Sequence, residues 1–205
     1  MKIARVEPSK HIRGRVLVFL EDGQLLKVTE NELLQFSLCP GQELTGETLQ
    51  CLQETAEKSQ WKQTAAAMVG QRMLSRKEVR DRLIKKGAEE TEAEETAQWL
   101  CDLGAVDDAS YAATLVRHYA ASGYGAGRIR QEFQKRGIPR EMWEQALEQL
   151  PPPEEAIRDY VRTKMRTGDE KERKKMADAL LRRGFSWSDI RPILSRWGAE
   201  MEEEE

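Results

Sequence analysis

The sequence has few of the residues that build metal centres and disulfide frameworks. Its three cysteines, Cys39, Cys51 and Cys101, are scattered with no paired spacing, and its two histidines, His11 and His118, lie near no obvious nucleophile. A structural metal site or a disulfide framework requires such residues in clusters. We therefore expect reduced thiols, as in cytosolic proteins, and no bound metal ion.

Long apolar segments are also missing. No run of apolar residues approaches 18 positions, and the N-terminus lacks the charged and then apolar pattern of a secretion signal. Charged residues make up 34% of the 205 positions and hydrophobic residues 39%, a profile of helices with one solvated face. We expect one or two domains in a soluble, cytoplasmic monomer that has no membrane partner.

A set of residues with catalytic spacing is missing too. Gly-Tyr-Gly-Ala-Gly at 123–127 suggests a phosphate loop, but no predicted strand precedes it and no Lys-Ser pair follows, so we interpret it as a turn between helices. Asp107 and Asp108 could be an acid–base pair of carboxylates. A cap by Asp108 on a helix from Ala109 to about Ala121 explains them more simply. We expect no enzymatic activity, no catalytic residue and no cofactor.

The sequence does contain a threefold internal repeat centred on Gly87, Gly137 and Gly184, with periods of 50 and then 47 residues. Apolar residues recur eight and four positions before each glycine and six, ten and thirteen positions after it, which are helical spacings. In repeat order these residues are Val79, Ile129, Met176; Leu83, Phe133, Leu180; Ala93, Trp143, Ile190; Ala97, Leu147, Leu194; and Leu100, Leu150, Trp197. The pattern predicts a tandem-repeat architecture in which each glycine joins two amphipathic helices.

Two basic residues precede each glycine: Lys85-Lys86, Lys135-Arg136 and Arg182-Arg183. The glycine suits a helix end, because helices commonly finish with a left-handed residue and glycine adopts that conformation at little cost. Basic residues at this end can stabilise the negative end of the helix dipole, or they can bind a partner. Their recurrence in all three units favours binding, and both interpretations stay open.

The N-terminal stretch predicts a small antiparallel sheet. Residues 2–6, 14–20 and 25–28 are apolar or alternate in polarity, and Glu21-Asp22-Gly23-Gln24 supplies a hairpin turn. A sheet of this size is marginal alone, so we expect it to cap or dock on the first repeat. Helix starts are predicted from capping boxes at Thr29 with Glu32, Ser75 with Glu78, Thr91 with Glu94, and Ser186 with Asp189.

Together these patterns predict a mainly α fold: an elongated array of three tandem three-helix repeats with a small N-terminal β-containing module. We place the N-terminal strand-containing module with its linker helix at 1–57, repeat 1 at 58–106, repeat 2 at 107–150, repeat 3 at 151–198 and an acidic tail at 199–205. The run Pro151-Pro152-Pro153 would form a stiff break between repeats two and three.

One motif is Ser75-Arg76-Lys77-Glu78-Val79-Arg80, followed by Leu83 and Lys86-Gly87. These residues resemble the first signature of the RecX family. Further matching motifs are Val106-Asp107-Asp108, Tyr111-Ala112, Gly125-Ala126-Gly127-Arg128-Ile129 and Lys135-Arg136-Gly137-Ile138. The N-terminal motifs Lys27-Val28-Thr29 and Gly41-Gln42-Glu43-Leu44 resemble the extension on the family's longer members.

The resemblance runs roughly from residue 2 to residue 197 and is stronger in the first two repeats than in the third. It departs from the family pattern at Val79, Ala126 and Tyr119, where leucine, proline and arginine are expected. It implies a regulator that binds the RecA recombinase filament and usually inhibits it, with a place in DNA recombination, DNA repair and the SOS response.

Charge is segregated along the chain. Residues 71–87 contain seven basic and two acidic residues, residues 89–108 contain eight acidic and no basic residues, and residues 158–197 are basic again. A surface patterned in both signs suits a protein partner or a nucleoprotein better than bare duplex DNA, although solvated helix faces alone would give the same pattern.

We expect the basic helices to form the partner-binding surface. Their candidate residues are Arg76, Lys77, Arg80, Lys85, Lys86, Arg128, Arg130, Lys135, Arg136, Lys174, Lys175, Arg182 and Arg183. The expected function is non-enzymatic: binding the RecA filament on single-stranded DNA and inhibiting its ATPase and recombination activities. The alternative is a protein of recombination or repair that binds single- or double-stranded DNA directly through the same helices.

Overall fold

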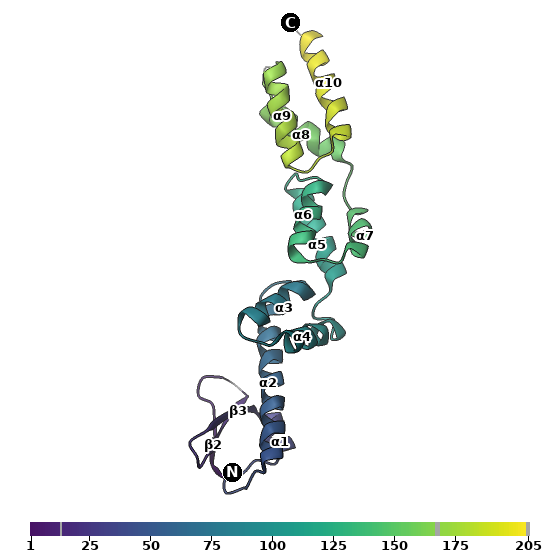
Figure 1. Ribbon diagram of the computed structural model, residues 1–205. Coiled ribbons are helices and arrows are strands. Elements are labelled where there is room, and N and C mark those ends of the chain that lie inside the picture. The colour runs from purple at the N-terminus through teal and green to yellow at the C-terminus, as the bar shows by residue number, and fades with distance from the viewer. Residues whose placement is uncertain (13, 167–168, 204–205) are drawn as a thin grey trace. The chain divides into compact units, whose positions relative to one another are not determined.

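The structure is a computed structural model that describes residues 1–12, 14–166 and 169–203, with side chains described as far as Trp197 (Figure 1). The chain divides into two compact units. Unit 1 comprises Met1–Arg72 and Arg80–Leu100, and unit 2 comprises Met73–Val79 and Cys101–Glu205. The fold is mainly α with one small antiparallel sheet near the N-terminus, which confirms the predicted fold class.

The sheet contains β1 (Ile3–Pro8), β2 (Arg15–Leu20) and β3 (Leu25–Thr29) in the order β1-β2-β3, with both pairings antiparallel. Alternate residues point to one face, because side chains alternate along a strand. That face is buried and belongs to one hydrophobic core, whose strand members include Ile3, Val16, Val18, Leu20, Leu26 and Val28.

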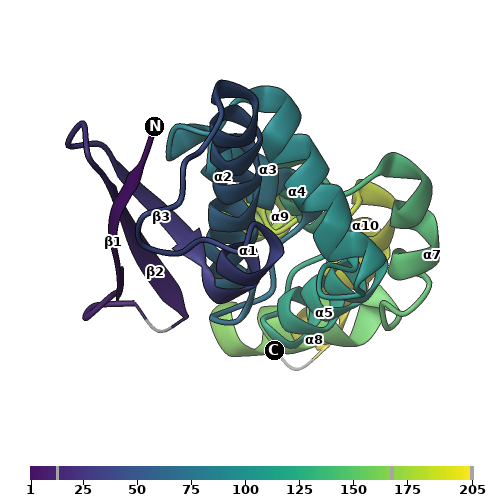
Figure 2. The ribbon, with the colours of Figure 1, turned by 90° about the horizontal axis from the view of Figure 1, so that it is seen from below.

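Two helices complete this core. Helix α1 (Glu30–Gln35) begins with the predicted capping box, because Thr29 Oγ1 accepts from the Glu32 amide and the Glu32 carboxylate accepts from the Thr29 amide. Helix α2 (Gly46–Val69) lies beside β3 and adds Leu49 and Leu52 (Figures 1 and 2). The predicted boundary between residues 57 and 58 falls inside α2, so the division into an N-terminal module and a first repeat stays a prediction.

Beyond α2, every regular element in the described residues is helical. We call α3, α6 and α9 the second helices, because each precedes a repeat glycine. The elements are α3 (Arg76–Lys85), α4 (Glu90–Asp102), α5 (Asp108–Ala121), α6 (Ala126–Arg136), η1 (Arg140–Met142), α7 (Trp143–Leu147), α8 (Pro153–Lys164), α9 (Glu170–Arg182) and α10 (Trp187–Glu203). Among the helices of the described ranges, none has both the length and the apolar character that crossing a membrane requires.

The three repeat glycines end the second helices in the same way. Gly87, Gly137 and Gly184 have φ angles of 102°, 68° and 89°, in the left-handed region where glycine is favoured. After each glycine, the next amide donates back to the carbonyl of the apolar residue four positions before the glycine. These bonds join Ala88 to Leu83, Ile138 to Phe133 and Phe185 to Leu180, at 3.0–3.2 Å. This is the Schellman arrangement, and it confirms the predicted turn.

The predicted core positions are confirmed. Val79, Leu83, Ile129, Phe133, Leu180 and Ile190 are each 0% exposed. The remaining repeat positions are buried, except Trp143, Leu150 and Trp197, which are half-buried and pack against the cores of their own repeats. The spacing around each glycine therefore predicted which faces of the helices pack together.

Two predicted helix caps are wrong. Thr91 lies inside the first turn of α4, and the Glu92 carboxylate accepts from the Glu89 amide, because the helix begins earlier than the Thr91–Glu94 box implied. Asp107, not Asp108, caps α5, because Asp107 Oδ1 accepts from the amides of Ala109 and Ser110.

The helix after Gly137 is irregular, and the predicted C-terminal tail is partly helical. The helix is divided into η1 and α7; Pro139 is the residue before η1, and no side chain caps its start. The predicted acidic tail at 199–205 is partly helical, because α10 continues to Glu203, and residues 204–205 lie outside the described residues.

Within unit 2, the glycine turn of one repeat contacts the start of the preceding second helix. The amides of Gly125 and Gly127 at the start of α6 donate to the carbonyls of Arg183 and Gly184, both at 2.9 Å. At the start of α3, Ser75 Oγ donates to the carbonyl of Arg136. These bonds pair amides and carbonyls that a helix end leaves without partners.

We predict that the three repeat glycines differ in their tolerance of alanine. A Cβ on Gly184 would lie 2.1 Å from the backbone nitrogen of Arg128, a Cβ on Gly137 would lie 2.7 Å from the Cβ of Lys77, and a Cβ on Gly87 would meet nothing within 4 Å. Gly87→Ala should cost only the left-handed strain, about 1–2 kcal/mol. Gly184→Ala should cost more, because two inter-repeat hydrogen bonds must separate, and Gly137→Ala should be intermediate. Urea unfolding of the three variants tests this order, and equal losses would contradict it.

Candidate partner-binding surface

One basic side chain is exposed at the same position in every second helix. Lys85, Lys135 and Arg182 stand two residues before the repeat glycines, in the last turn of α3, α6 and α9. The glycine turn fixes the end of each helix and so presents this side chain in the same way each time. Among the described residues, none forms an ion pair or hydrogen bond with these three side chains. All three side chains are exposed.

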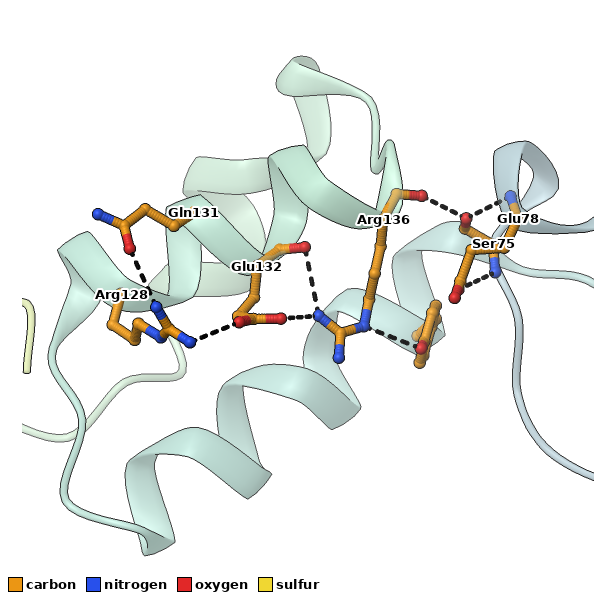
Figure 3. Close-up of polar contacts among 7 residues, drawn as sticks. Ser75, Glu78, Arg128, Gln131, Glu132 and Arg136 are labelled. Carbon is orange, nitrogen blue, oxygen red and sulfur yellow. Dashed lines mark hydrogen bonds and ion pairs between the residues drawn. The ribbon is translucent and has the colours of Figure 1, made fainter. Parts of the chain in front are cut away.

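We call the two basic residues before each repeat glycine a doublet. In repeat 2 the second residue of the doublet, Arg136, bonds within the chain. The Arg136 guanidinium forms an ion pair with Glu132, and its Nε donates to the Tyr111 hydroxyl at 3.2 Å (Figure 3). Arg128, one turn before Glu132 in α6, contacts the other oxygen of the same carboxylate at 3.0 Å. Arg136 therefore stabilises its own repeat, and its carbonyl bonds to Ser75 at the junction with α3.

Glu132 is the centre of this network and is itself buried, with a side chain only 5% exposed. Burial alone raises the pKa of Glu132, but the hydrogen bond and charge of Arg136 outweigh burial, with help from Tyr119 and Arg128. The pKa of Glu132 therefore lies below its ordinary value of 4.5. The hydrogen bonds to Glu132 and Tyr111 likewise raise the pKa of Arg136 against the effect of burial. Both groups are charged at neutral pH.

Arg183 has the equivalent place in repeat 3 and also bonds inward. Its Nη1 donates to the carbonyls of Ser122 and Gly123 at 3.1 and 3.0 Å. Its guanidinium also lies over the rings of Tyr124 and Tyr160, at 5.0 and 4.5 Å from their centroids, a cation–π geometry. Arg183 therefore joins repeat 3 to the turn before α6.

In repeat 1 the doublet is exposed at both positions. Lys85 and Lys86, together with Arg82, line a cleft of about 700 Å³ whose other wall includes Met68 of α2 and Gln71. All of these residues belong to unit 1. Three cationic side chains around one concave surface suit an acidic group on a partner.

The other predicted residues are bonded within the chain to different degrees. Arg80 contacts Asp81 and Glu94, Arg130 contacts the exposed Glu144 at 3.1 Å, and Lys174 contacts the exposed Glu170 at 3.1 Å. The Arg76 amide donates to Asp108 at 3.0 Å, and the Lys77 side chain lies against Gly137. Lys175 is exposed. Exposed ion pairs of this kind contribute little to stability, so Arg130 and Lys174 can exchange them for a partner.

Glu132 and Tyr111 are not among the predicted site residues. Glu132 stands four residues from both Arg128 and Arg136, and this spacing places all three on one face of a helix. That signal was available in the sequence, but it does not reveal that the carboxylate is buried.

A second cleft, of about 590 Å³, lies at the junction of the second and third repeats within unit 2. Its walls include Tyr124 and Arg130 on one side and Leu181 and Phe185 on the other. Leu181 is 45% exposed. The cleft therefore presents apolar surface beside one of the predicted basic residues.

The chain is a tandem helical-repeat protein. In each three-helix unit a left-handed glycine ends the second helix, and an exposed basic residue stands two positions before that glycine. Three models of the RecX family match these units in order: the first three-helix domain at residues 62–100, the second at 107–147 and the third at 154–194. The chain belongs to the RecX family, which is a family of regulatory proteins.

Individual relatives agree with this assignment. The regulatory protein RecX of Geobacillus kaustophilus is 31% identical over 187 residues, covering 88% of this chain and 70% of the relative. The regulatory protein RecX of Xanthomonas axonopodis pv. citri is 36% identical over 133 residues, covering 63% of this chain and 82% of the relative. A crystal structure of regulatory protein RecX matches the fold with a TM-score of 0.76 at 24% identity, covering 94% of this chain and 98% of that one.

The two residues of the second doublet should lose unequal amounts of stability on charge reversal. Arg136→Glu removes the partner of a buried carboxylate and adds a second one, so it should lower the free energy of unfolding by about 3 kcal/mol or more. Lys135→Glu should cost less than about 1 kcal/mol, because it changes only an exposed helix-end charge. Urea unfolding of both variants measures the difference, and equal losses would mean that the Arg136–Glu132 pair does not stabilise the repeat.

The Glu132 carboxylate should also contribute a pH-dependent part of the stability. Because its pKa is lower in the folded state than in the unfolded chain, its contribution is complete above about pH 4.5 and is lost as the pH falls through the folded value. Glu132→Gln should therefore destabilise the protein at pH 7, and the gap from the unmodified protein should narrow below about pH 4.5. Unfolding measured from pH 7 to pH 3 tests this, with Glu144→Gln as the exposed control. A constant gap would contradict the prediction.

Proposed function

We propose that the protein is a non-enzymatic regulator that binds the RecA recombinase filament on single-stranded DNA and inhibits its ATPase, recombination and related activities. Its membership of a regulatory family supports this proposal. The observation that carries it is the recurrence of an exposed basic residue, Lys85, Lys135 or Arg182, at the same place in each second helix.

A repeated basic position suits a repeated partner. A filament presents the same surface on successive subunits, so successive repeats can each make a weak contact with it. Linked weak contacts combine into strong binding, because the second contact forms at a high effective concentration. Occupation of neighbouring subunits would hinder the movements that accompany ATP hydrolysis and filament growth. This action requires no catalytic residue, cofactor or metal ion in the regulator.

Within this proposal seven of the thirteen basic residues divide between two roles. Lys85, Lys86, Lys135, Lys175 and Arg182 are exposed and meet the partner first. Arg136 and Arg183 hold the repeats in position through their internal contacts. The protein would act in the cytoplasm, where the recombinase and its DNA are found. Its processes would be DNA repair and the SOS response.

Sedimentation with recombinase filaments tests the proposal directly. The protein should co-sediment with RecA on single-stranded DNA, should not co-sediment with that DNA alone, and should lower the filament's rate of ATP hydrolysis. Equal sedimentation with DNA alone, single- or double-stranded, would favour the direct DNA-binding alternative and overturn the proposal.

A charge-reversal variant tests the surface. Lys85→Glu, Lys135→Glu and Arg182→Glu together should weaken filament binding by about tenfold or more, because like charges then face the partner. Thermal melting should hardly change, since these side chains are exposed. The matched control reverses Lys10, Arg158 and Lys164, which are exposed basic residues outside the second helices, and should bind within about twofold of the unmodified protein. Full inhibition by the first variant would place the binding surface elsewhere.

A further inference from the structure

The outer edge of β3 is open for pairing. β3 is an edge strand because the sheet order is β1-β2-β3. The Leu20 amide donates to the Gln24 carbonyl and the Glu30 amide donates to the Gly14 carbonyl. Bonded pairs alternate along an antiparallel ladder. With Leu26 opposite Val18 and Val28 opposite Val16, the backbone groups of Leu26 and Val28 point to β2, and those of Leu25, Lys27 and Thr29 point outward.

Only the last of these outward positions is occupied. The Thr29 amide donates to Glu32 Oε2 at 2.8 Å. For the outward amides and carbonyls of Leu25 and Lys27, the described part of the chain provides no hydrogen-bond partner. Both residues are exposed. Unpaired groups in a row along an edge strand are a template for pairing with another chain.

A groove lies between this edge and α2. It encloses about 560 Å³ and is lined by Leu25, Leu26 and Lys27 of β3 and by one face of α2; Figure 2 shows β3 as the strand beside that helix. An extended peptide that enters such a groove adds a strand to the sheet and rests its side chains against the helix. At about 3.3 Å per residue, the five residues of β3 offer an edge for a segment of similar length.

The charge of the groove selects the segment. Glu54 and Glu57 line it from α2, against the single cation Lys27. Glu32, at the end of the edge, is 2% exposed, and its Oε1 has no hydrogen-bond partner among the described residues. The acidic excess favours a segment that carries Lys or Arg. A second copy of this edge suits it poorly, because antiparallel pairing of two β3 strands centred on Lys27 would place two lysines side by side.

We propose that β3 and α2 form a strand-addition site for an extended, basic segment of a second protein. The backbone of the segment bonds to Leu25 and Lys27, and its basic side chains meet Glu54 and Glu57. The site is separate from the basic second helices, so its failure in a test would leave the proposed function standing.

A synthetic peptide probes the site in the full-length chain. The probe is the capped heptapeptide Lys-Val-Lys-Val-Thr-Val-Lys, and binding is followed by the amide NMR signals of β3. The outward amides of Leu25 and Lys27 should shift and become protected from hydrogen exchange. The same peptide N-methylated at alternate residues, and a version with Glu in place of Lys, should each bind at least about tenfold more weakly. Equal binding by the N-methylated peptide, or no binding at millimolar concentration, would overturn the proposal.

Two pairs of variants locate the contact. Lys27→Pro removes the outward N–H without disturbing the bonds to β2 and should weaken binding roughly three- to tenfold relative to Lys27→Ala, which keeps the N–H. Glu54→Lys with Glu57→Lys should weaken binding similarly. Glu141→Lys with Glu148→Lys changes the net charge equally at exposed positions outside the groove and should have no effect.

The outcomes separate the possible occupants. If Lys27→Pro unfolds the sheet, the N-methylated peptide decides the question without a variant. If the Leu25 and Lys27 amides instead become protected as the concentration of the protein alone rises, the edge pairs with a second copy and the proposal is wrong. If Glu141→Lys with Glu148→Lys weakens peptide binding as much as Glu54→Lys with Glu57→Lys, the glutamates of the groove do not select the basic segment.

Discussion

The hydrogen bonds between the ends of successive second helices are the constraint on which unit 2 depends. The carbonyls of Arg183 and Gly184 end α9 and accept from the amides that begin α6. Each set of groups would otherwise need water or a side chain, because a helix cannot satisfy its own ends. The left-handed glycine makes the approach possible, since any side chain at Gly184 would collide with the backbone of Arg128. A single glycine therefore both ends a helix and joins two repeats.

The same constraint explains why the basic doublets have divided roles. Their second members lie at the junction, where Arg136 pairs with the buried Glu132 and Arg183 bonds to the turn before α6. Their first members face outward from the same turn. Lys86 is the exception, because it is exposed and lines the cleft beside α2. In repeat 1 both residues of the doublet are therefore exposed, and both line the cleft between α2 and α3.

Much of this fold follows from short-range rules. Helical spacing around Gly137 predicted that Ile129 and Phe133 are core residues, because an apolar side chain at that register has only one face on which to pack. The identity of the α5 cap was missed, because Asp107 and Asp108 are both aspartates, and the Asp108 carboxylate accepts from the distant Arg76 amide instead. The buried state of Glu132 and the open edge of β3 depend on contacts between distant segments. No local pattern in a single sequence encodes such contacts.

Repeat 2 has complementary ends. Amides at the start of α6 donate to carbonyls in the glycine turn of repeat 3. At the other end of α6, the carbonyl of Arg136 accepts from Ser75 Oγ at the start of α3. A repeat with hydrogen-bond donors at one end and matching acceptors at the other can be joined to further copies of itself through the same hydrogen bonds. Gene duplication would then lengthen such a protein by whole repeats. The number of repeats would determine the length of polymer that one molecule contacts. At the start of α9 an amide is capped within the repeat instead, because the Glu172 amide donates to Asp169 Oδ1 at 2.6 Å.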